Sequence, residues 1–311
     1  MAQQHLDRRT FLAAGAAALG ATVTTDAHAA PFFARTRLPI GIQLYTLAPD
    51  AQKDLDGTLA AVAKIGYRAI ELAGFAGRTP AQFKAALDRV GLKAPSAHIQ
   101  ARGATGSFES DLGKLAEDLA TLGATYAVMP SPYVPDRVSQ AAGGDYRKMM
   151  SALTADDWKF NAEYLNRNAA ALKRSGIKVG YHNHNFEFAP HGRTTGMDIL
   201  LAETDPSLVT FEADVGWMVA AGVDPLAYLQ KHKGRFTLMH VKDVKATTLT
   251  NFALRMDPTE VGSGTIDWKR LLPAAHATGV RGFFVEQEPP FAHPRIESAK
   301  ISHDFLARVN A

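Results

Sequence analysis

Short apolar runs alternate with amphipathic stretches along the chain from Leu38 to the C-terminus. The apolar runs are rich in β-branched and aromatic residues, which is typical of buried strands. The stretches between them repeat an apolar residue every three or four positions, which is typical of helices. We expect strands in residues 38–47, 67–74, 92–100, 124–132, 177–188, 207–217, 235–244 and 281–290. We expect helices in residues 56–66, 79–91, 110–123, 154–176, 196–205, 224–234, 267–279 and from about 295 onward.

Capping residues support two of these helices. Thr79 is a preferred N-cap residue, Pro80 suits the first helical position, and Gly91 suits the residue after the helix. Thr154 and Asp157 have the spacing of a capping box at the start of the longest helix. The starts of both helices are therefore predicted by residue type as well as by periodicity.

Eight strand–helix units without an internal break predict a single α/β domain, a (β/α)8 TIM barrel over residues 38–311. The alternative is a doubly wound open sheet, which would need an early G-x-G-x-x-G phosphate loop or a switch-point motif. The sequence contains no G-x-G-x-x-G motif. The sequence VGSG, residues 261–264, comes late and precedes a helix, where such glycines more often form a plain turn.

The first 29 residues have the pattern of an export signal. Arg8 and Arg9 precede a weakly apolar Ala/Gly run, and residues 27–29 form a small-x-small cleavage site. This pattern resembles a twin-arginine signal peptide, and a linker over residues 30–37 follows it. It predicts a periplasmic or secreted protein with no stable membrane insertion after cleavage. The alternative for the same residues is a disordered Ala-rich tail or a short anchor.

Composition narrows the available chemistry. Charged residues make up 21% and hydrophobic residues 46% of the 311 residues, as in soluble enzymes. The net charge is +3 without a run of Lys or Arg, so nucleic acid is not an expected partner, whereas a homo-oligomer is compatible with the sequence. The chain has no cysteine, so any metal site must use His, Asp and Glu. Such ligands suit Mn, Zn, Co, Fe or Mg.

Ionisable residues follow the apolar runs in strand after strand. The carboxyl ends of barrel strands meet at one rim, where the active sites of such barrels lie. A charge in a buried strand is costly unless it is paired or ligated. One such residue is more often structural than a ligand, but recurrence on one rim favours a site. The residues are Glu71, His98, His182, His184, Glu187, Asp214, His240, Lys242, Asp243, Glu286 and Glu288.

The last four strands supply a complete ligand set for a divalent metal ion. Residues two apart on a strand share a face, and the residue nearer the apolar run lies deeper. We therefore expect the metal ligands to be His182, Asp214, His240 and Glu286. His184, Lys242 and Glu288 are expected further out, around the metal or against the substrate.

These residues lie in motifs that resemble a known family. The motifs are GIQLYTL, IELAG, SAHIQ, GYHNHNFEF, EADVGWMVAAGVDP, LMHVKDV, EVGSGTIDW and FFVEQE, in this order between Ile40 and about Leu306. They are similar to those of the xylose-isomerase-like barrel superfamily, in its sugar phosphate isomerase/epimerase branch. Their number and order are specific for the superfamily but not for a substrate.

The resemblance implies a divalent metal, often Mn, bound by residues of the last four strands. In the ketose epimerases of this family the ligands are Glu, Asp, His and Glu, and both glutamates exchange protons with the carbon beside the carbonyl. Asp214, His240 and Glu286 match the last three ligands. The first position falls on His182, which is a departure from the family pattern. Trp217 is a second departure, because many relatives have a substrate-contacting His there.

The resemblance predicts an enzyme, an isomerase or epimerase that acts on a sugar or keto-sugar through an enediolate. Glu286 is the expected base, and His184 and Lys242 are the further catalytic candidates. The departure at His182 leaves the second acid/base group open. The residues expected to contact the carbohydrate substrate are Glu71, His98, Trp217 and Glu288.

Two other functions fit the same residues. A lyase or hydrolase of 3-keto-glycosides needs one base, and export favours it because phosphorylated sugars are uncommon outside the cytoplasm. A non-catalytic exported sugar-binding barrel is compatible with the departures at His182 and Trp217.

Overall fold

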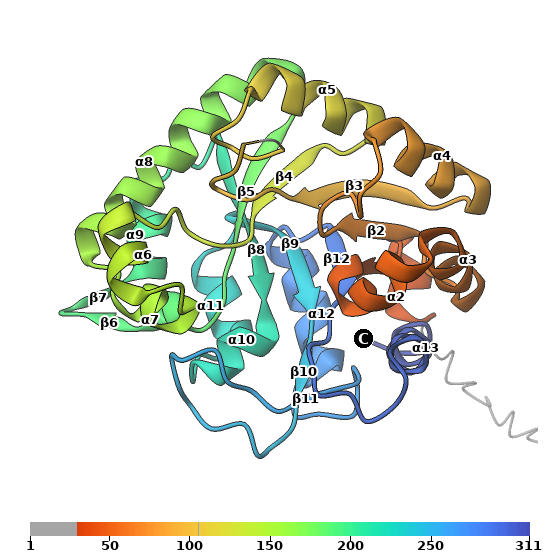
Figure 1. Ribbon diagram of the computed structural model, residues 1–311. Coiled ribbons are helices and arrows are strands. Elements are labelled where there is room, and N and C mark those ends of the chain that lie inside the picture. Colours follow the sequence, from red (N-terminus) through yellow and green to blue (C-terminus); the bar gives the residue numbers. More distant parts are fainter. Residues whose placement is uncertain (1–29, 105) are drawn as a thin grey trace, which may run out of the picture.

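The computed structural model describes residues 30–104 and 106–311 of the chain (Figure 1). The export signal expected in residues 1–29 lies outside the described residues. Within the segment expected to be a linker, helix α1 (Phe32–Thr36) forms. Phe32 and Phe33 are buried, and their rings meet Phe283 edge-on with centroid distances of 5.8 and 5.7 Å. These two aromatic residues therefore belong to the packed fold.

Eight parallel strands close into a barrel, which confirms the fold class predicted from the alternating pattern. Their order around the barrel is β1-β12-β9-β8-β5-β4-β3-β2. The barrel strands are β1 (Gly41–Gln43), β2 (Ala69–Leu72), β3 (Lys93–His98), β4 (Tyr126–Met129), β5 (Lys178–His182), β8 (Val209–Asp214), β9 (Phe236–Val241) and β12 (Gly282–Val285). Two short antiparallel sheets pair β6 (Pro190–His191) with β7 (Thr194–Thr195) and β10 (Asp243–Val244) with β11 (Pro258–Thr259).

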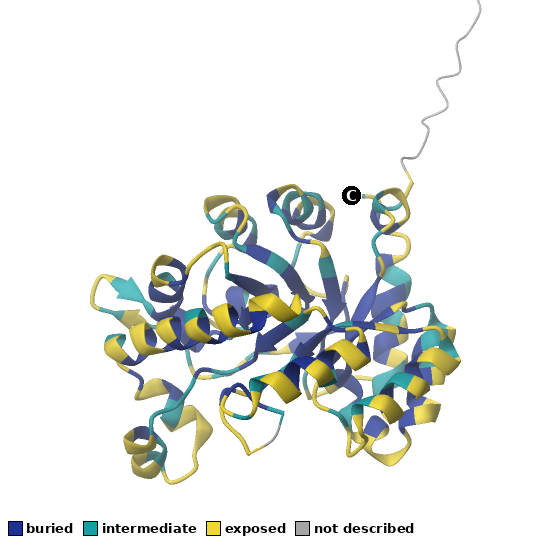
Figure 2. Cartoon of the chain, turned by 90° about the horizontal axis from the view of Figure 1, so that it is seen from above, coloured by how far each residue is buried: buried dark blue, intermediate teal, exposed yellow. Residues whose placement is uncertain are grey.

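Helices surround the barrel, and Figure 2 shows that their outward faces are exposed while the strands are buried. They are α2 (Ala48–Lys53), α3 (Leu55–Ile65), α4 (Pro80–Val90), α5 (Leu112–Leu122), α6 (Asp136–Ala142), α7 (Tyr146–Ser151), α8 (Ala155–Leu172), α9 (Gly196–Glu203), α10 (Val215–Ala220), α11 (Pro225–Lys231), α12 (Trp268–Thr278) and α13 (Arg295–Leu306). The short 3-10 turns are η1 (Leu44–Leu47), η2 (Lys173–Ser175) and η3 (Phe186–Phe188). In residues 30–104 and 106–311, no helix has the length and apolar character that crossing a membrane requires.

The predicted helix caps are present. The Thr79 hydroxyl accepts a hydrogen bond from the backbone N–H of Gln82, and the Gln82 side chain completes a capping box at the start of α4. Gly91 ends that helix with a left-handed φ of 72°. Thr154 and Asp157 form the capping box of α8. The residue types therefore place these helix boundaries correctly.

The barrel interior changes from apolar to polar along the strands. Its amino-terminal part contains a small buried cluster of Ala69, Val128, Leu238 and Phe284. Two residues further along the chain from three of these, the same faces carry Glu71, His240 and Glu286. The apolar cluster thus separates the polar residues at the carboxyl end from the opposite end of the barrel.

All eight barrel strands end earlier than the apolar pattern predicted, and two of them lead directly into buried turns. β1 stops at Gln43, whose side chain accepts a hydrogen bond from the backbone N–H of Tyr45 and starts the turn η1. β5 stops at His182, and the chain then turns into η3. Both apolar runs continue past the strands because the turns that follow are buried too. Apolar periodicity alone does not distinguish a buried strand from a buried turn. The two-residue spacing predicted that His182 and His184 share one strand face. In the structure His184 lies beyond the end of β5, so the two residues do not share a strand face.

Asp243 fixes the loop that contains the VGSG sequence. Its carboxylate accepts hydrogen bonds from the backbone N–H groups of Val244, Gly262, Gly264 and Ile266 and from the indole N–H of Trp268. A Cβ atom at Gly264 would lie 2.2 Å from Asp243 Oδ1, so only glycine allows this approach. The VGSG sequence is thus a turn before α12, held by one buried carboxylate.

Replacing Asp243 by alanine should lower the free energy of unfolding by about 3 kcal/mol or more, because several buried donors lose a charged acceptor. Urea denaturation measures this change. The control is Asp50→Ala, at an exposed aspartate, for which we expect a change within about 0.5 kcal/mol. Equal effects of the two substitutions would show that Asp243 does not anchor the loop.

Candidate metal centre

The structure brings the four predicted metal ligands together at the carboxyl end of the barrel. His182 ends β5, Asp214 ends β8, His240 lies in β9, and Glu286 directly follows β12. One potential ligand atom of each lies within 4.8 Å of the others, and all four residues are buried. Asp214 and His240 are partners in the register of β8 and β9, which places them side by side. Strand pairing therefore sets the arrangement of this group.

The distances within the group suit atoms that share one cation. His240 Nδ1 lies 2.9 Å from Glu286 Oε2 and 3.6 Å from Asp214 Oδ2. His182 Nε2 lies 3.8 Å from Asp214 Oδ2. Ligand atoms at about 2.1 Å from a first-row metal ion lie roughly 3–3.5 Å apart. Small side-chain movements are enough to close the group around an ion.

Two observations test whether these residues fit a divalent metal ion. Asp214 Oδ2 is buried and makes no hydrogen bond of accepted geometry among the described residues, although Lys242 Nζ lies 2.7 Å away as an ion-pair partner. Burial, together with the neighbouring His240, lowers the pKa of His182 well below 6.5, so this ring is neutral, as a ligand must be. The donor set of two imidazoles and two carboxylates therefore fits such an ion.

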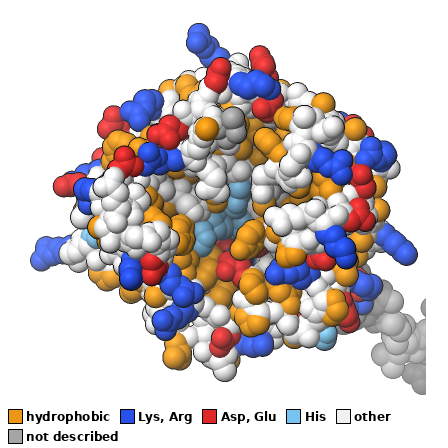
Figure 3. All heavy atoms as spheres, viewed as in Figure 1, with side chains coloured by type: hydrophobic (Ala, Val, Ile, Leu, Met, Phe, Trp, Pro, Cys, Tyr) orange, Lys and Arg blue, Asp and Glu red, His pale blue; other side chains and the backbone are white. Residues whose placement is uncertain are grey.

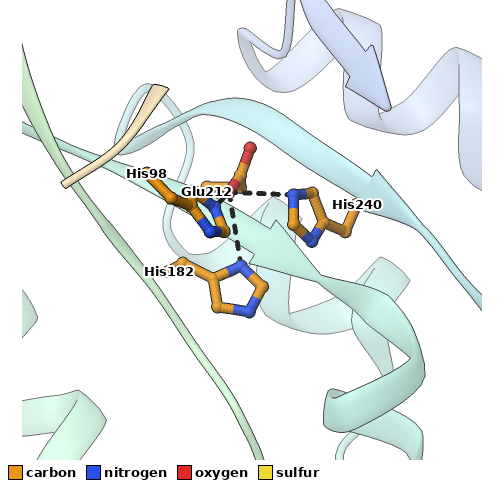
Figure 4. A group of neighbouring side chains, drawn as sticks. All are labelled: His98, His182, Glu212 and His240. Carbon is orange, nitrogen blue, oxygen red and sulfur yellow. Dashed lines mark hydrogen bonds and ion pairs between the residues drawn. The ribbon is translucent and has the colours of Figure 1, made fainter. Parts of the chain in front are cut away.

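A second group of side chains lies beside the first and shares two of its histidines (Figure 4). Glu212 Oε2 lies 3.1 Å from His98 Nε2 and 3.1 Å from His240 Nε2. The same oxygen lies 3.3 Å from His182 Nδ1. Glu212 is completely buried. One carboxylate from β8 therefore contacts imidazole rings from three other strands.

Glu212 was missing from the residues selected in the sequence. It lies inside an apolar run, whereas the selection took residues at the ends of such runs. The signal was its spacing: Glu212 precedes Asp214 by two positions, so both side chains share one strand face. An acidic residue on that face of a buried strand requires a partner, and the histidines provide it.

Glu71 was expected to contact the substrate. In the structure its carboxylate instead contacts the His240 ring. Glu71 is fully buried, and its carboxylate accepts hydrogen bonds from Gln43 Nε2 at 2.9 Å and Ser96 Oγ at 2.5 Å. Its Oε2 lies 2.6 Å from His240 Nε2. These partners occupy both carboxylate oxygens. The structure therefore places Glu71 behind the ligand His240.

Glu71 and Glu212 determine which nitrogen each ligand histidine offers. His240 Nε2 faces both carboxylates, so a proton on Nε2 leaves Nδ1 directed to Asp214 and Glu286. A carboxylate behind a metal-bound imidazole fixes the tautomer and raises the basicity of the ring. Burial favours the neutral ring of His240, but Glu212 and Glu286 outweigh it and raise the pKa of His240. A metal ion bound at this ring would therefore have to displace a proton.

His98 lies between the same two carboxylates and also reaches the cavity above them. Its Nε2 is 3.2 Å from Glu71 Oε2 and 3.1 Å from Glu212 Oε2. Burial opposes the charged form, but these carboxylates raise the pKa of His98 to about 9. His98 therefore carries a positive charge at neutral pH and offsets part of the buried negative charge.

Lys242 is fully buried, although its sequence spacing placed it further out than the ligands. Its Nζ lies 2.7 Å from Asp214 Oδ2, 2.7 Å from Glu286 Oε2 and 3.0 Å from Glu288 Oε1. Burial works against the charge, but these carboxylates raise the pKa of Lys242 well above 10.5. Asp243, the next residue in the chain, directs its carboxylate into its own loop. Lys242 is thus an internal cation that contacts two predicted metal ligands.

His184 remains beside His182 although the strand ends between them. Their ring centroids are 4.8 Å apart, and the His184 ring stacks on Phe186 at 5.3 Å. Burial lowers the pKa of His184 to about 3, so the ring is neutral. The completely buried Glu187 accepts hydrogen bonds from the His184 backbone N–H and from the Tyr181 hydroxyl, each at 2.8 Å. Glu187 therefore holds the turn that carries His184.

A cavity of about 790 Å³ opens above the ligand group. Figure 3 shows a hollow with histidine side chains on its floor and acidic side chains beside them. Three of the four expected substrate contacts line it: His98, Trp217 and Glu288. The catalytic candidates Glu286 and His184 line it as well. Burial raises the pKa of Glu288, although Lys242 acts in the opposite direction. This upward shift favours the protonated carboxyl group.

Comparison with known proteins gives a consistent family assignment. Residues 59–309 match the profile of the family described as xylose isomerase-like TIM barrel. The chain is 26% identical over 282 residues to the inosose dehydratase of Geobacillus kaustophilus, which covers 82% of this chain and 87% of that enzyme. It is 32% identical over 154 residues to the inosose dehydratase of Geobacillus thermodenitrificans, covering 45% of this chain and 51% of the relative.

Solved structures show the same fold. A sugar phosphate isomerase/epimerase from Parabacteroides distasonis has a TM-score of 0.68 and 26% identity, with 86% of this chain and 97% of that chain covered. An L-ribulose 3-epimerase has a TM-score of 0.61 and 16% identity, with 86% of this chain and 93% of that chain covered. The second likeness concerns the fold alone.

Replacing Glu212 by glutamine should weaken Mn²⁺ binding about ten- to a hundredfold, because the ligand histidines lose the carboxylate that orients them. Isothermal titration calorimetry of the folded variant measures this affinity. The matched control is Glu260→Gln, at a buried glutamate bonded to Ser298 and Gln287 outside the site. The orienting role is wrong if Glu212→Gln binds the ion as tightly as the control.

Glu187 should make stability depend on pH. Burial raises its pKa from 4.5 to about 8, so the folded state binds the proton more tightly than the unfolded state. This contribution is present at low pH and is lost as the pH rises from about 5 through 8. Urea denaturation between pH 5.5 and 9 should show that Glu187→Gln loses less stability with rising pH than the wild type. A constant difference between the two proteins contradicts the assignment.

Proposed function

Because this chain belongs to the xylose isomerase-like TIM barrel family, we propose that it is a metal-dependent enzyme acting on a sugar, an isomerase or epimerase that moves a proton beside a carbonyl group. The observation that carries the proposal is the buried group of His182, Asp214, His240 and Glu286 on the floor of the cavity. The similar protein from Parabacteroides distasonis, described as a sugar phosphate isomerase/epimerase, supports this class of reaction.

These four residues would hold a divalent ion, with Mn as the first candidate and Zn, Co, Fe or Mg as alternatives. A divalent ion bound there supplies a Lewis acid that stabilises negative charge on the carbonyl oxygen. His240 and His182 would hold it through the nitrogens that do not face Glu71 and Glu212. The two supporting carboxylates therefore belong to the machinery of the proposed reaction.

Glu286 and Glu288 are the proposed proton-transfer pair. Both line the cavity, and Lys242 Nζ joins them at 2.7 and 3.0 Å. Burial acts to raise the pKa of Glu286, but Lys242 and His240 outweigh this effect and lower it well below 4.5. For Glu288 the effect of burial prevails, and its pKa is raised. Such opposed shifts let one carboxylate accept a proton while the other donates one. Glu288 is thus the proposed partner of Glu286 in proton transfer.

A second candidate function is elimination. The curated relatives named above are inosose dehydratases, and the wider match spans 87% of the relative. Loss of water from a hydroxylated ketone starts with the same proton removal and then needs an acid for the leaving oxygen. Glu286 as the base, and Glu288 or the protonated His98 as the acid, suit these two steps. A lyase or hydrolase of 3-keto-glycosides uses the same steps with a sugar as leaving group.

We also propose that the protein works outside the cytoplasm, on the basis of the twin-arginine pattern in residues 1–29. Phosphorylated sugars are uncommon there. This location therefore favours an unphosphorylated substrate.

Proton exchange in D₂O tests the proposed chemistry. The Mn²⁺-loaded protein should incorporate deuterium beside the carbonyl of a ketose or 3-keto-glucoside, as measured by NMR. Glu286→Gln should slow the exchange by about 10²- to 10⁴-fold, because the base is lost. His240→Ala should also lose the ion. Glu260→Gln, outside the site, should keep the wild-type rate.

Mass spectrometry of the products separates the two candidates. An unchanged mass identifies an isomerase or epimerase, whereas loss of water or of a second sugar identifies elimination or cleavage. A protein that binds sugar without any exchange is a binding barrel, and that outcome overturns the enzymatic proposal.

A further inference from the structure

We infer that the cavity accepts an uncharged substrate of two linked rings, with the second ring in an outer subsite formed by Tyr45, Ser131, Tyr146 and Arg147. This inference rests on the proposed function, because it places the first ring at the group of His182, Asp214, His240 and Glu286. The substrate class is a glycoside or disaccharide, and a sugar phosphate is disfavoured.

The size of the cavity is the first argument. Its volume of about 790 Å³ lies in the upper part of the range of roughly 300–1,000 Å³ for sites that enclose drug-sized ligands. A single pyranose ring is much smaller than such a ligand. A monosaccharide held at the floor therefore leaves the outer part of the cavity without substrate.

The outer part is built by segments that project beyond the barrel strands. Tyr45 lies in η1 after β1, and Tyr146 begins α7 in the long connection between β4 and α8. Arg147 donates a hydrogen bond to the backbone oxygen of Leu254, at 3.4 Å, and Leu254 also lines the cavity. This bond joins the connection after β4 to the loop after β10. The outer wall is therefore a structured surface formed by distant parts of the chain.

Exposed aromatic side chains occur in this outer part. Tyr45 is 49% and Tyr146 is 38% exposed, although both line the cavity. Aromatic faces of this kind pack against the C–H face of a pyranose ring and carry a polar end that bonds to hydroxyl groups. Ser131 Oγ lies 2.7 Å from the Tyr146 hydroxyl, and either atom can be the donor. These groups supply both kinds of contact that a sugar ring needs.

The charges of the lining argue against a phosphate group. Asp145, Glu286 and Glu288 contribute acidic side chains, whereas Arg147 is the one Lys or Arg among the described residues that line the cavity. Proteins bind phosphate through several Arg, Lys or backbone N–H donors. In the outer part of the cavity Asp145 offsets Arg147, so a dianionic phosphate would find no net positive charge there. A neutral second ring needs no such charge.

Calorimetry on the Mn²⁺-loaded protein tests the inference with four disaccharides (cellobiose, maltose, trehalose and sucrose), with glucose and with glucose 6-phosphate. At least one disaccharide should bind about tenfold or more tightly than glucose, and glucose 6-phosphate should bind no better than glucose. Tyr45→Ala and Tyr146→Ala should each remove most of the disaccharide advantage and leave glucose binding unchanged. The matched control is Phe160→Ala, because Phe160 is also 38% exposed but lies on α8, away from the cavity lining.

The results separate this inference from the proposed function. Equal binding of glucose and all disaccharides, tighter binding of glucose 6-phosphate, or unchanged binding by both tyrosine variants overturns the outer subsite. Deuterium exchange on a keto-monosaccharide at full rate in the same preparations would then leave the proposed enzymatic function standing. Absence of both sugar binding and exchange overturns both.

Discussion

Negative charge buried at one end of the barrel is the constraint on which the rest of the site depends. Glu71, Glu212, Asp214 and Glu286 are nearly or completely inaccessible to solvent. Carboxylates in such surroundings are stable only when cations and hydrogen-bond donors face them. The chain supplies Lys242, and it raises the proton affinity of His98 and His240, next to these groups. The proposed divalent ion would add further positive charge to this balance.

The barrel architecture makes this concentration of charge possible. The cluster of Ala69, Val128, Leu238 and Phe284 excludes water from the amino-terminal side of the polar group. Strand register places side chains of neighbouring strands at the same level along the barrel axis. His182 and His240 each have two ring nitrogens. One nitrogen faces a supporting carboxylate, Glu212 or Glu71, and the other faces the ligand group. The ligands are therefore oriented by a second layer that is as buried as the first.

The alternating pattern was sufficient to predict the barrel, and the ligand quartet followed from residues at the ends of four strands. Glu212 was missed because it lies within an apolar run, and only its pairing with histidines of other strands shows its role. The full burial of Glu71 and Lys242 was not predicted, because depth depends on where each strand stops and on barrel stagger. Those quantities arise from tertiary packing, which local sequence does not report.

The position of Lys242 has a consequence for how the site is assembled. Its ammonium group contacts Asp214 and Glu286 through the oxygens that also face His240. The two carboxylates therefore have a counter-ion that is covalently part of the chain. Charge repulsion between them is reduced by the chain itself, so the barrel could fold without the proposed ion. Binding of that ion would then be a separate step from folding.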